Sequence, residues 1–235
     1  MRRTAAEPPT ARHGETPWLG RSGRMTPMLG EEAGTAERAA VNLRVLTLPG
    51  WLSSGPTHWQ TRWEQDHGFV RVEQADWLWP RRGDWMARLE EVLLETAAPA
   101  LLVAHSLGCQ LVAAWAAQSQ HATRVRGALL VAPPDTERSD MPPQLHTWRP
   151  MQRQRLPFAA TVVASHDDPY CALERSESLA AAWGATWVVA GARGHLNGES
   201  GIDDWPDGIA LLQTLATDPA EQAQPLQHAA ISAGR

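Results

Sequence analysis

The sequence predicts one α/β domain built on a parallel sheet, and three observations support this fold class. From residue 41 onward, short apolar runs alternate with longer segments in which apolar residues recur at helical spacing. The apolar runs end at Gly, Pro, Asp or Ser, which are residues typical of turns. The chain of 235 residues is long enough for one domain with a large core. Strand and helix in alternation indicate about six mainly parallel strands with helices on both faces.

The individual elements follow from these patterns in chain order. The expected strands are 41–48, 69–73, 100–104, 125–132, 159–164 and 185–190. The expected helices are 57–64, 85–96, 111–117, 172–183 and 205–216. Gly83-Asp84 stands where the N-cap of the second helix is expected. Residues 134–157 are polar and rich in proline, so we expect a loop with at most one or two short helices and little or no lid.

Composition separates the ends of the chain from this domain. Residues 1–40 are dominated by Pro, Gly, Thr, Glu and Arg without a periodic apolar face, which predicts a disordered N-terminal tail. The α/β domain is expected to span 41–217, and 218–235 is expected to be a loose C-terminal tail.

Charge and residue usage exclude several classes of function. The net charge is −5 and no basic stripe is present, so we expect no nucleic-acid partner. No apolar stretch approaches the ~20 residues of a membrane span. All 21 Lys+Arg positions are arginine, which excludes Schiff-base chemistry and a P-loop lysine. Two cysteines make no disulfide framework and suit a reducing cytoplasm, and no cluster has metal-ligand spacing, so we expect neither a metal nor a cofactor.

The segment 100–117 carries the main chemical signal. An apolar run ends at Ala104, Ser106 follows two places on, Gly108 follows two places later, and good helix formers come next. Strand, sharp turn with a serine at its tip, and helix make a nucleophile elbow, whose flanking positions must be small. Ala104 stands where the usual pattern has glycine. The alternative is an ordinary strand and helix with Ser106 as the N-cap.

A serine nucleophile also needs donors for the oxyanion and a pocket for the substrate. The backbone N–H of Leu107 lies at a helix N-terminus, and Gly50 or Trp51, directly after the first strand, is expected to supply the second donor. Residues expected to line the pocket are Gly50, His58, Trp59 and Trp148, the last by closing over the site.

The serine further needs a base and an acid that orients the base. His195 follows the last strand in a Gly-rich loop, where a mobile base is expected, whereas His105 is expected to point the other way at the turn. The acid should follow the penultimate strand, at Asp167 or Asp168. We favour Asp168 because Pro169 stiffens the turn, and Asp167 is then free to accept from loop N–H groups. The chain order Ser, Asp, His is that of an α/β-hydrolase.

These motifs together resemble a known family. The stretches 48–59, 105–108, 167–170 and 194–197 are similar to small serine hydrolases of the retinoblastoma-binding-protein-nine and YdeN group. The likeness covers roughly residues 41 to 216. It implies a compact, nearly lidless α/β-hydrolase fold, with the nucleophile at Ser106, the acid at Asp168 and the base at His195.

The sequence therefore predicts a cytoplasmic serine hydrolase that cleaves small ester-type acyl substrates through an acyl-enzyme. Two alternatives stay open at this stage. Amide or thioester cleavage would use the same three residues. An inactive hydrolase scaffold that serves as a protein-interaction module would keep the fold without the activity.

Overall fold

A computed structural model describes residues 43–217 of the chain. The predicted disordered tail (1–40) and the predicted loose tail (218–235) lie outside the described residues, so both stay predictions.

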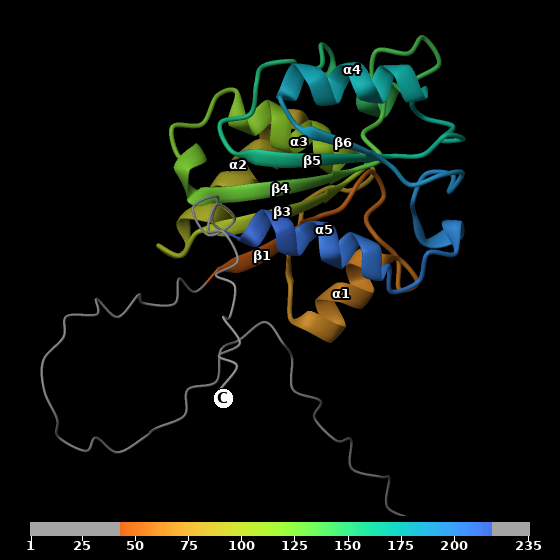
Figure 1. Cartoon of the computed structure of the whole chain (residues 1–235). Helices are drawn as coiled ribbons and strands as arrows, with labels where there is room; N and C mark the ends of the chain where they lie inside the picture. Colours follow the sequence, from red (N-terminus) through yellow and green to blue (C-terminus); the bar gives the residue numbers. More distant parts are fainter. Residues whose placement is uncertain (1–42, 218–235) are drawn as a thin grey trace, which may run out of the picture. The chain divides into compact units, whose positions relative to one another are not determined.

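The core of the fold is a six-stranded sheet in which every neighbouring pair is parallel (Figure 1). The strand order is β2-β1-β3-β4-β5-β6. The strands are β1 (Arg44–Leu48), β2 (Val70–Arg71), β3 (Ala100–His105), β4 (Val125–Val131), β5 (Ala159–Ala164) and β6 (Thr186–Val189). The prediction of a six-stranded parallel sheet is confirmed. Only the edge strand β2 is much shorter than its apolar pattern indicates.

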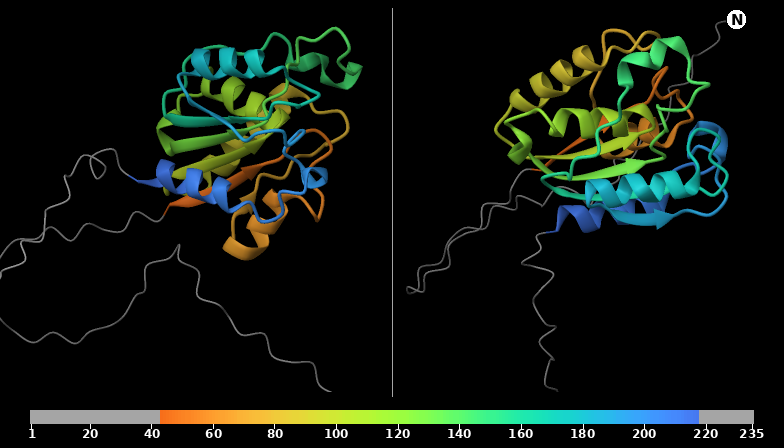
Figure 2. Two further views of the ribbon diagram at one scale, coloured as in Figure 1. Left: turned by 45° about the vertical axis from the view of Figure 1, so that its right-hand side comes forward. Right: turned by 90° about the horizontal axis from the view of Figure 1, so that it is seen from above.

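Five α-helices cover the sheet on both faces. They are α1 (Trp59–His67), α2 (Arg82–Leu94), α3 (Leu107–Ala116), α4 (Leu173–Trp183) and α5 (Pro206–Ala216). Helices α2, α3 and α4 lie on one face of the sheet, and α1 and α5 lie on the other (Figures 1 and 2). Three short 3-10 helices complete the described elements: η1 (Ala122–Arg124), η2 (Pro143–Trp148) and η3 (Gly198–Ser200).

The start of α2 differs from its prediction. The helix begins at Arg82 after the N-cap residue Arg81, which makes no capping hydrogen bond, so Gly83-Asp84 is not the N-cap. Asp84 instead lies in the first turn of the helix. A carboxylate is stabilised there by the positive end of the helix dipole, which explains why an acidic residue near the helix start misled the prediction.

The strands bury side chains on both faces. Leu46, Leu102 and Leu130 are completely buried in the core beneath α2, α3 and α4. On the other face, the ring of Trp59 in α1 packs against two other indoles. Its ring centroid is 4.7 Å from that of Trp63 and 5.0 Å from that of Trp205, which precedes α5. Between β4 and β5 the only helical element is η2, so the compact fold with little lid is confirmed.

The order of the strands decides where a ligand can reach the sheet. From β1 the chain runs outward to β2 and then returns past β1 to β3. Loops after β1 and β3 therefore leave the same edge of the sheet side by side, at the switch point where parallel sheets bind their ligands. No helix of the described part, 43–217, is long and apolar enough to cross a membrane.

Candidate active site

Ser106 occupies a strained turn between β3 and α3. Its backbone has φ 52° and ψ −122°, a conformation that non-glycine residues seldom adopt. The Ser106 N–H donates to the Val131 carbonyl at 2.9 Å, and the Ser106 carbonyl accepts from the Cys109 N–H at 2.9 Å. These bonds hold the turn, and the Ser106 side chain projects into the cavity described below.

The turn is strained because neighbouring backbones approach it closely. A Cβ added at Gly108 would lie 2.2 Å from the carbonyl oxygen of Leu48, at the end of β1. A Cβ added at Gly50 would lie 2.7 Å from the Ser106 Cβ. Only glycine fits at either position without a shift of backbone. The close approach brings the start of the Gly50–Trp51 loop against the serine.

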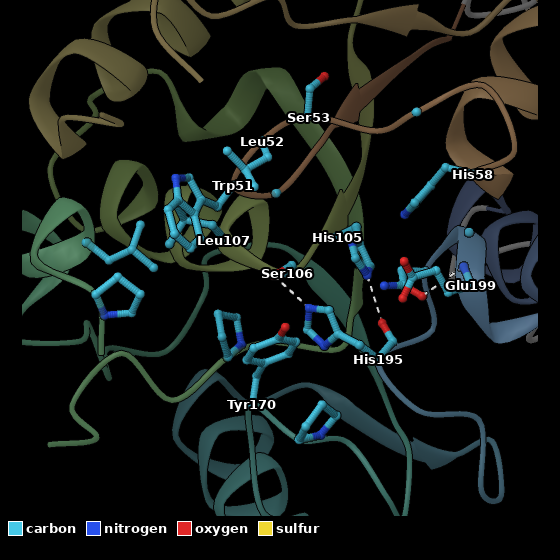
Figure 3. Close-up of a pocket in the computed structure, with 18 of the residues that line it drawn as sticks. Trp51, Leu52, Ser53, His58, His105, Ser106, Leu107, Tyr170, His195 and Glu199 are labelled. Carbon is cyan, nitrogen blue, oxygen red and sulfur yellow. Dashed lines mark hydrogen bonds between the residues drawn. The ribbon is translucent and has the colours of Figure 1, made fainter. Parts of the chain in front are cut away.

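His195 lies between Ser106 and Asp168 and contacts both. Figure 3 shows its hydrogen bond with Ser106 as a dashed line. Its Nε2 is 2.8 Å from Ser106 Oγ, and its Nδ1 is 2.9 and 3.0 Å from the two Asp168 oxygens. A carboxylate only accepts, so Nδ1 carries the proton and Nε2 of the neutral ring accepts from the serine hydroxyl. The side chains of His195 and Asp168 are 10 % and 3 % exposed, so this chain of hydrogen bonds is largely shielded from water.

The two aspartates have different contacts. Asp168 accepts from His195 and from the N–H of Tyr170 at 2.9 Å. Asp167 accepts from the Ser165 hydroxyl at 2.7 Å and from the Gly194 N–H at 2.8 Å, and does not contact the imidazole. The hydrogen bond from Ser165, followed by that from Gly194, lowers the pKa of Asp167 below its ordinary value. Asp167 therefore ties the loop after β5 to the loop that carries His195, as the sequence analysis anticipated for the residue not chosen as the acid.

His105 has a structural contact that the sequence analysis missed. Its Nε2–H donates to the backbone carbonyl of His195 at 2.9 Å, and the two rings are 4.9 Å apart. Burial holds the pKa of His105 well below its ordinary value, and the neighbouring His58 lowers it further, so the ring is neutral. The prediction that His105 points the other way at the turn is wrong, because its ring lies against that of His195 and lines the cavity beside Ser106. The place of His105 at the end of a buried strand does not identify a partner 90 positions along the chain.

His58 lies behind His105, at the start of α1. Its Nδ1 accepts from the Gln60 N–H at 3.1 Å, and its ring lies edge-on to His105 at 4.7 Å. Burial is the main reason why the pKa of His58 is lowered to about 4, and the neighbouring Arg71 and His195 lower it further. Two neutral histidines thus lie beneath His195.

A cavity of about 580 Å³ opens above Ser106. This volume is in the range typical of small-molecule sites. One side, here called the apolar side, is formed by Trp51, Leu52 and Leu107. The opposite side is polar and includes His58 and Glu199. Figure 3 shows Trp51, Leu52 and Leu107 on one side of Ser106, and His58 and Glu199 on the other.

Two of the four pocket-lining predictions agree with the cavity and two do not. Gly50 and His58 line it, as does Trp51, which was predicted as an oxyanion donor. Trp59 and Trp148 do not, and each is 1 % exposed. The indole of Trp59 donates to the Leu196 carbonyl, and that of Trp148 donates to the Pro80 carbonyl. Large aromatic side chains whose N–H finds a buried acceptor are drawn into the core, which explains both errors.

The two predicted oxyanion donors lie at the same wall. Leu107 is the first residue of α3, so its N–H has no acceptor within the helix. Trp51 follows Gly50, whose backbone abuts Ser106. Their use as donors stays a prediction. No group of three or more His, Cys, Asp or Glu side chains in 43–217 is placed to hold a metal ion.

A parallel sheet in this strand order, with a serine on a strained turn after β3 and a histidine after β6, defines the chain as an α/β-hydrolase. Comparison with family models then specifies the family. A serine hydrolase family model matches residues 45–214, so the chain belongs to that family.

Solved structures give the same assignment. A YdeN-like hydrolase of Pectobacterium atrosepticum is 27 % identical, with a TM-score of 0.65 over 74 % of this chain and 91 % of that one. The ydeN gene product of Bacillus subtilis is 21 % identical, with a TM-score of 0.59 over 74 % of this chain and 99 % of that one. These similarities confirm the predicted likeness to the YdeN group.

A more distant structure shares the fold alone. A thermophilic esterase of Thermogutta terrifontis is 14 % identical, with a TM-score of 0.54 over 75 % of this chain and 92 % of that one. The comparison with curated proteins finds no match.

Proposed function

We propose that this serine hydrolase cleaves small ester-type acyl substrates through Ser106, His195 and Asp168. The observation that carries the proposal is the unbroken chain of hydrogen bonds from Ser106 Oγ through both nitrogens of His195 to Asp168. A serine hydroxyl becomes a nucleophile when a positioned base takes its proton. The carboxylate keeps that base in the correct tautomer and stabilises the imidazolium.

The proposed reaction has two halves. Ser106 Oγ attacks the ester carbonyl while its proton passes to His195 Nε2, and the negative charge forms on the carbonyl oxygen. The N–H groups of Leu107 and Trp51 stabilise that charge, and loss of one such donor typically costs about 100- to 1,000-fold in rate. The tetrahedral intermediate collapses as His195 donates its proton to the departing alkoxide, which leaves an acyl-enzyme. In the second half, water attacks the acyl carbonyl while His195 takes its proton. The new intermediate collapses as His195 returns the proton to Ser106 Oγ, which releases the acid and the free enzyme.

The proposal predicts that Ser106→Ala abolishes both labelling by a fluorophosphonate and turnover of p-nitrophenyl acetate. Ser53 supplies a matched control, because it also lines the cavity but accepts from Arg71 and has no histidine partner. Ser53→Ala should label and turn over like the wild type. Undiminished turnover in Ser106→Ala would refute the assignment. A wild-type protein that ignores the fluorophosphonate would favour the inactive scaffold instead.

A comparison of ester, thioester and amide substrates addresses the remaining alternative. The same residues serve all three bonds, so the ranking of kcat/KM decides which substrate class the cavity selects. We expect the esters to rank first.

A further inference from the structure

The loop after β1 holds an apolar side chain in an unfavourable position at the mouth of the cavity. Leu52 lines the cavity, yet its exposed fraction is 58 %. Leu52 and Ser53 also have φ angles of 68° and 66°, in the left-handed region that favours glycine. One exposed leucine on a surface is ordinary. An exposed leucine held in a strained backbone at the edge of a cavity calls for an explanation.

The strained conformation is maintained by contacts from other loops. The N–H of Leu52 donates to the Trp77 carbonyl at 3.2 Å, and the indole of Trp51 donates to the Leu78 carbonyl at 3.0 Å. The Ser53 N–H donates to the Gly50 carbonyl at 3.1 Å, which closes the turn. Strain that the surroundings enforce in this way is characteristic of ligand-binding segments.

The chemistry at Ser106 indicates which part of an ester lies near this loop. The leaving-group oxygen must lie next to His195 Nε2, because that nitrogen donates the proton to it. The acyl chain then extends away from His195. In Figure 3, Trp51, Leu52 and Leu107 lie on the side of Ser106 away from His195. The apolar side of the cavity is therefore the acyl side.

We infer that Leu52 forms the outer edge of an acyl subsite and that the enzyme prefers esters of apolar acyl groups of medium length over acetates. The inference rests on the proposed function of Ser106. A short acyl group contacts only the inner wall at Leu107, whereas a longer chain extends to Leu52 at the mouth of the cavity and shields it from water. Each CH₂ removed from water is worth about fourfold in kcat/KM.

The test measures kcat/KM for p-nitrophenyl acetate, butyrate and hexanoate in the wild type, Leu52→Gly and Leu52→Asn. Glycine and asparagine both tolerate positive φ, so neither change should lower Tm. We expect the ratio of kcat/KM for hexanoate to that for acetate to fall about tenfold in both variants. Leu94→Ser is the matched control, because Leu94 is an exposed leucine (42 %) at the end of α2, outside the cavity. It should leave the ratio unchanged.

An unchanged ratio in both Leu52 variants would overturn the inference and leave the proposed function standing. Absence of Ser106-dependent turnover of all three esters in the wild type would overturn the proposed function and the inference with it. Acetate esters of longer alcohols provide the last arm, and they should be insensitive to Leu52. Sensitivity there would put Leu52 beside the leaving group and refute the acyl assignment.

Discussion

Ser106 and His195 meet at a distance of 2.8 Å but are held by different kinds of contact. The turn that carries Ser106 is set by packing, because every residue of β3 is buried and the backbone of β1 touches Gly108. The loop that carries His195 is half-exposed and is held by separate hydrogen bonds, among them those from Gly194 to Asp167, from Arg193 to Ser165 and from His105 to the His195 carbonyl. The turn should therefore be sensitive to added volume, and the loop to the loss of one donor or acceptor.

The largest effect on activity should come from replacing Asp168, the acid that orients His195. Asp168→Asn replaces the acceptor that orients His195, and we expect kcat/KM for p-nitrophenyl acetate to fall about 1,000- to 10,000-fold. Asp167→Asn is the matched control. Asp167 contacts only Ser165 and loop N–H groups, so its loss should cost about tenfold or less. A larger loss in Asp167→Asn would move the acid by one residue and break the distinction between the two aspartates.

On the packing side, Gly108→Ala should destabilise the whole domain. The new methyl group would meet the Leu48 carbonyl at 2.2 Å, and backbone cannot give way as a side-chain tip can. We expect the free energy of unfolding to drop by about 3 kcal/mol, measured by urea denaturation. At Gly55 an added Cβ meets nothing within 4 Å, so Gly55→Ala should change the free energy of unfolding by less than ~1 kcal/mol. Equal stabilities of the two variants would show that the turn is less tightly packed than its geometry indicates.

The same contrast explains what the sequence could predict. Ser106 was placed correctly on a turn because strand, serine and helix are adjacent in the chain, and local patterns report local structure. Asp168 and His195 were placed at the same edge by topology, since residues after parallel strands share one edge of a sheet. The fold required no more than the alternation of elements.

Contacts between distant segments could not be predicted from the sequence. The hydrogen bond from His105 to the carbonyl of His195 depends on the depth of one loop above the sheet. The burial of Trp59 and Trp148 depends on carbonyl acceptors at Leu196 and Pro80. No pattern in one sequence reports the position of a distant backbone carbonyl, so the histidine beneath the site was missed and two tryptophans were wrongly assigned to the cavity.

The neutral histidines beneath His195 predict a pH-dependent stability. His58 has a pKa of about 4 in the folded protein against 6.5 ordinarily, with Arg71, His105 and His195 as its charged or titratable neighbours. Between these values the unfolded chain binds a proton that the folded protein does not, so stability falls as pH drops below 6.5. At pH 5 the loss from His58 amounts to about 2 kcal/mol. The lowered pKa of His105 adds to the loss in the same direction.

Urea denaturation at pH 7.5 and pH 5 measures this loss. In His58→Asn the side chain can still accept from the Gln60 N–H as an N-cap, but it does not titrate. The drop in unfolding free energy between the two pH values should then shrink by about 2 kcal/mol relative to the wild type. An identical drop would show that His58 is protonated in the folded protein near pH 5, and hence not held neutral beneath the site.

His105 joins the two regions, because it ends the buried strand β3 and its ring donates to the loop carbonyl of His195. His105→Phe keeps a buried ring but removes the donor, and we expect kcat for p-nitrophenyl acetate to fall about tenfold with little change in KM. His105→Gln restores an N–H donor and should recover part of the rate. A merely space-filling role predicts the opposite order, with Phe close to the wild type and Gln impaired.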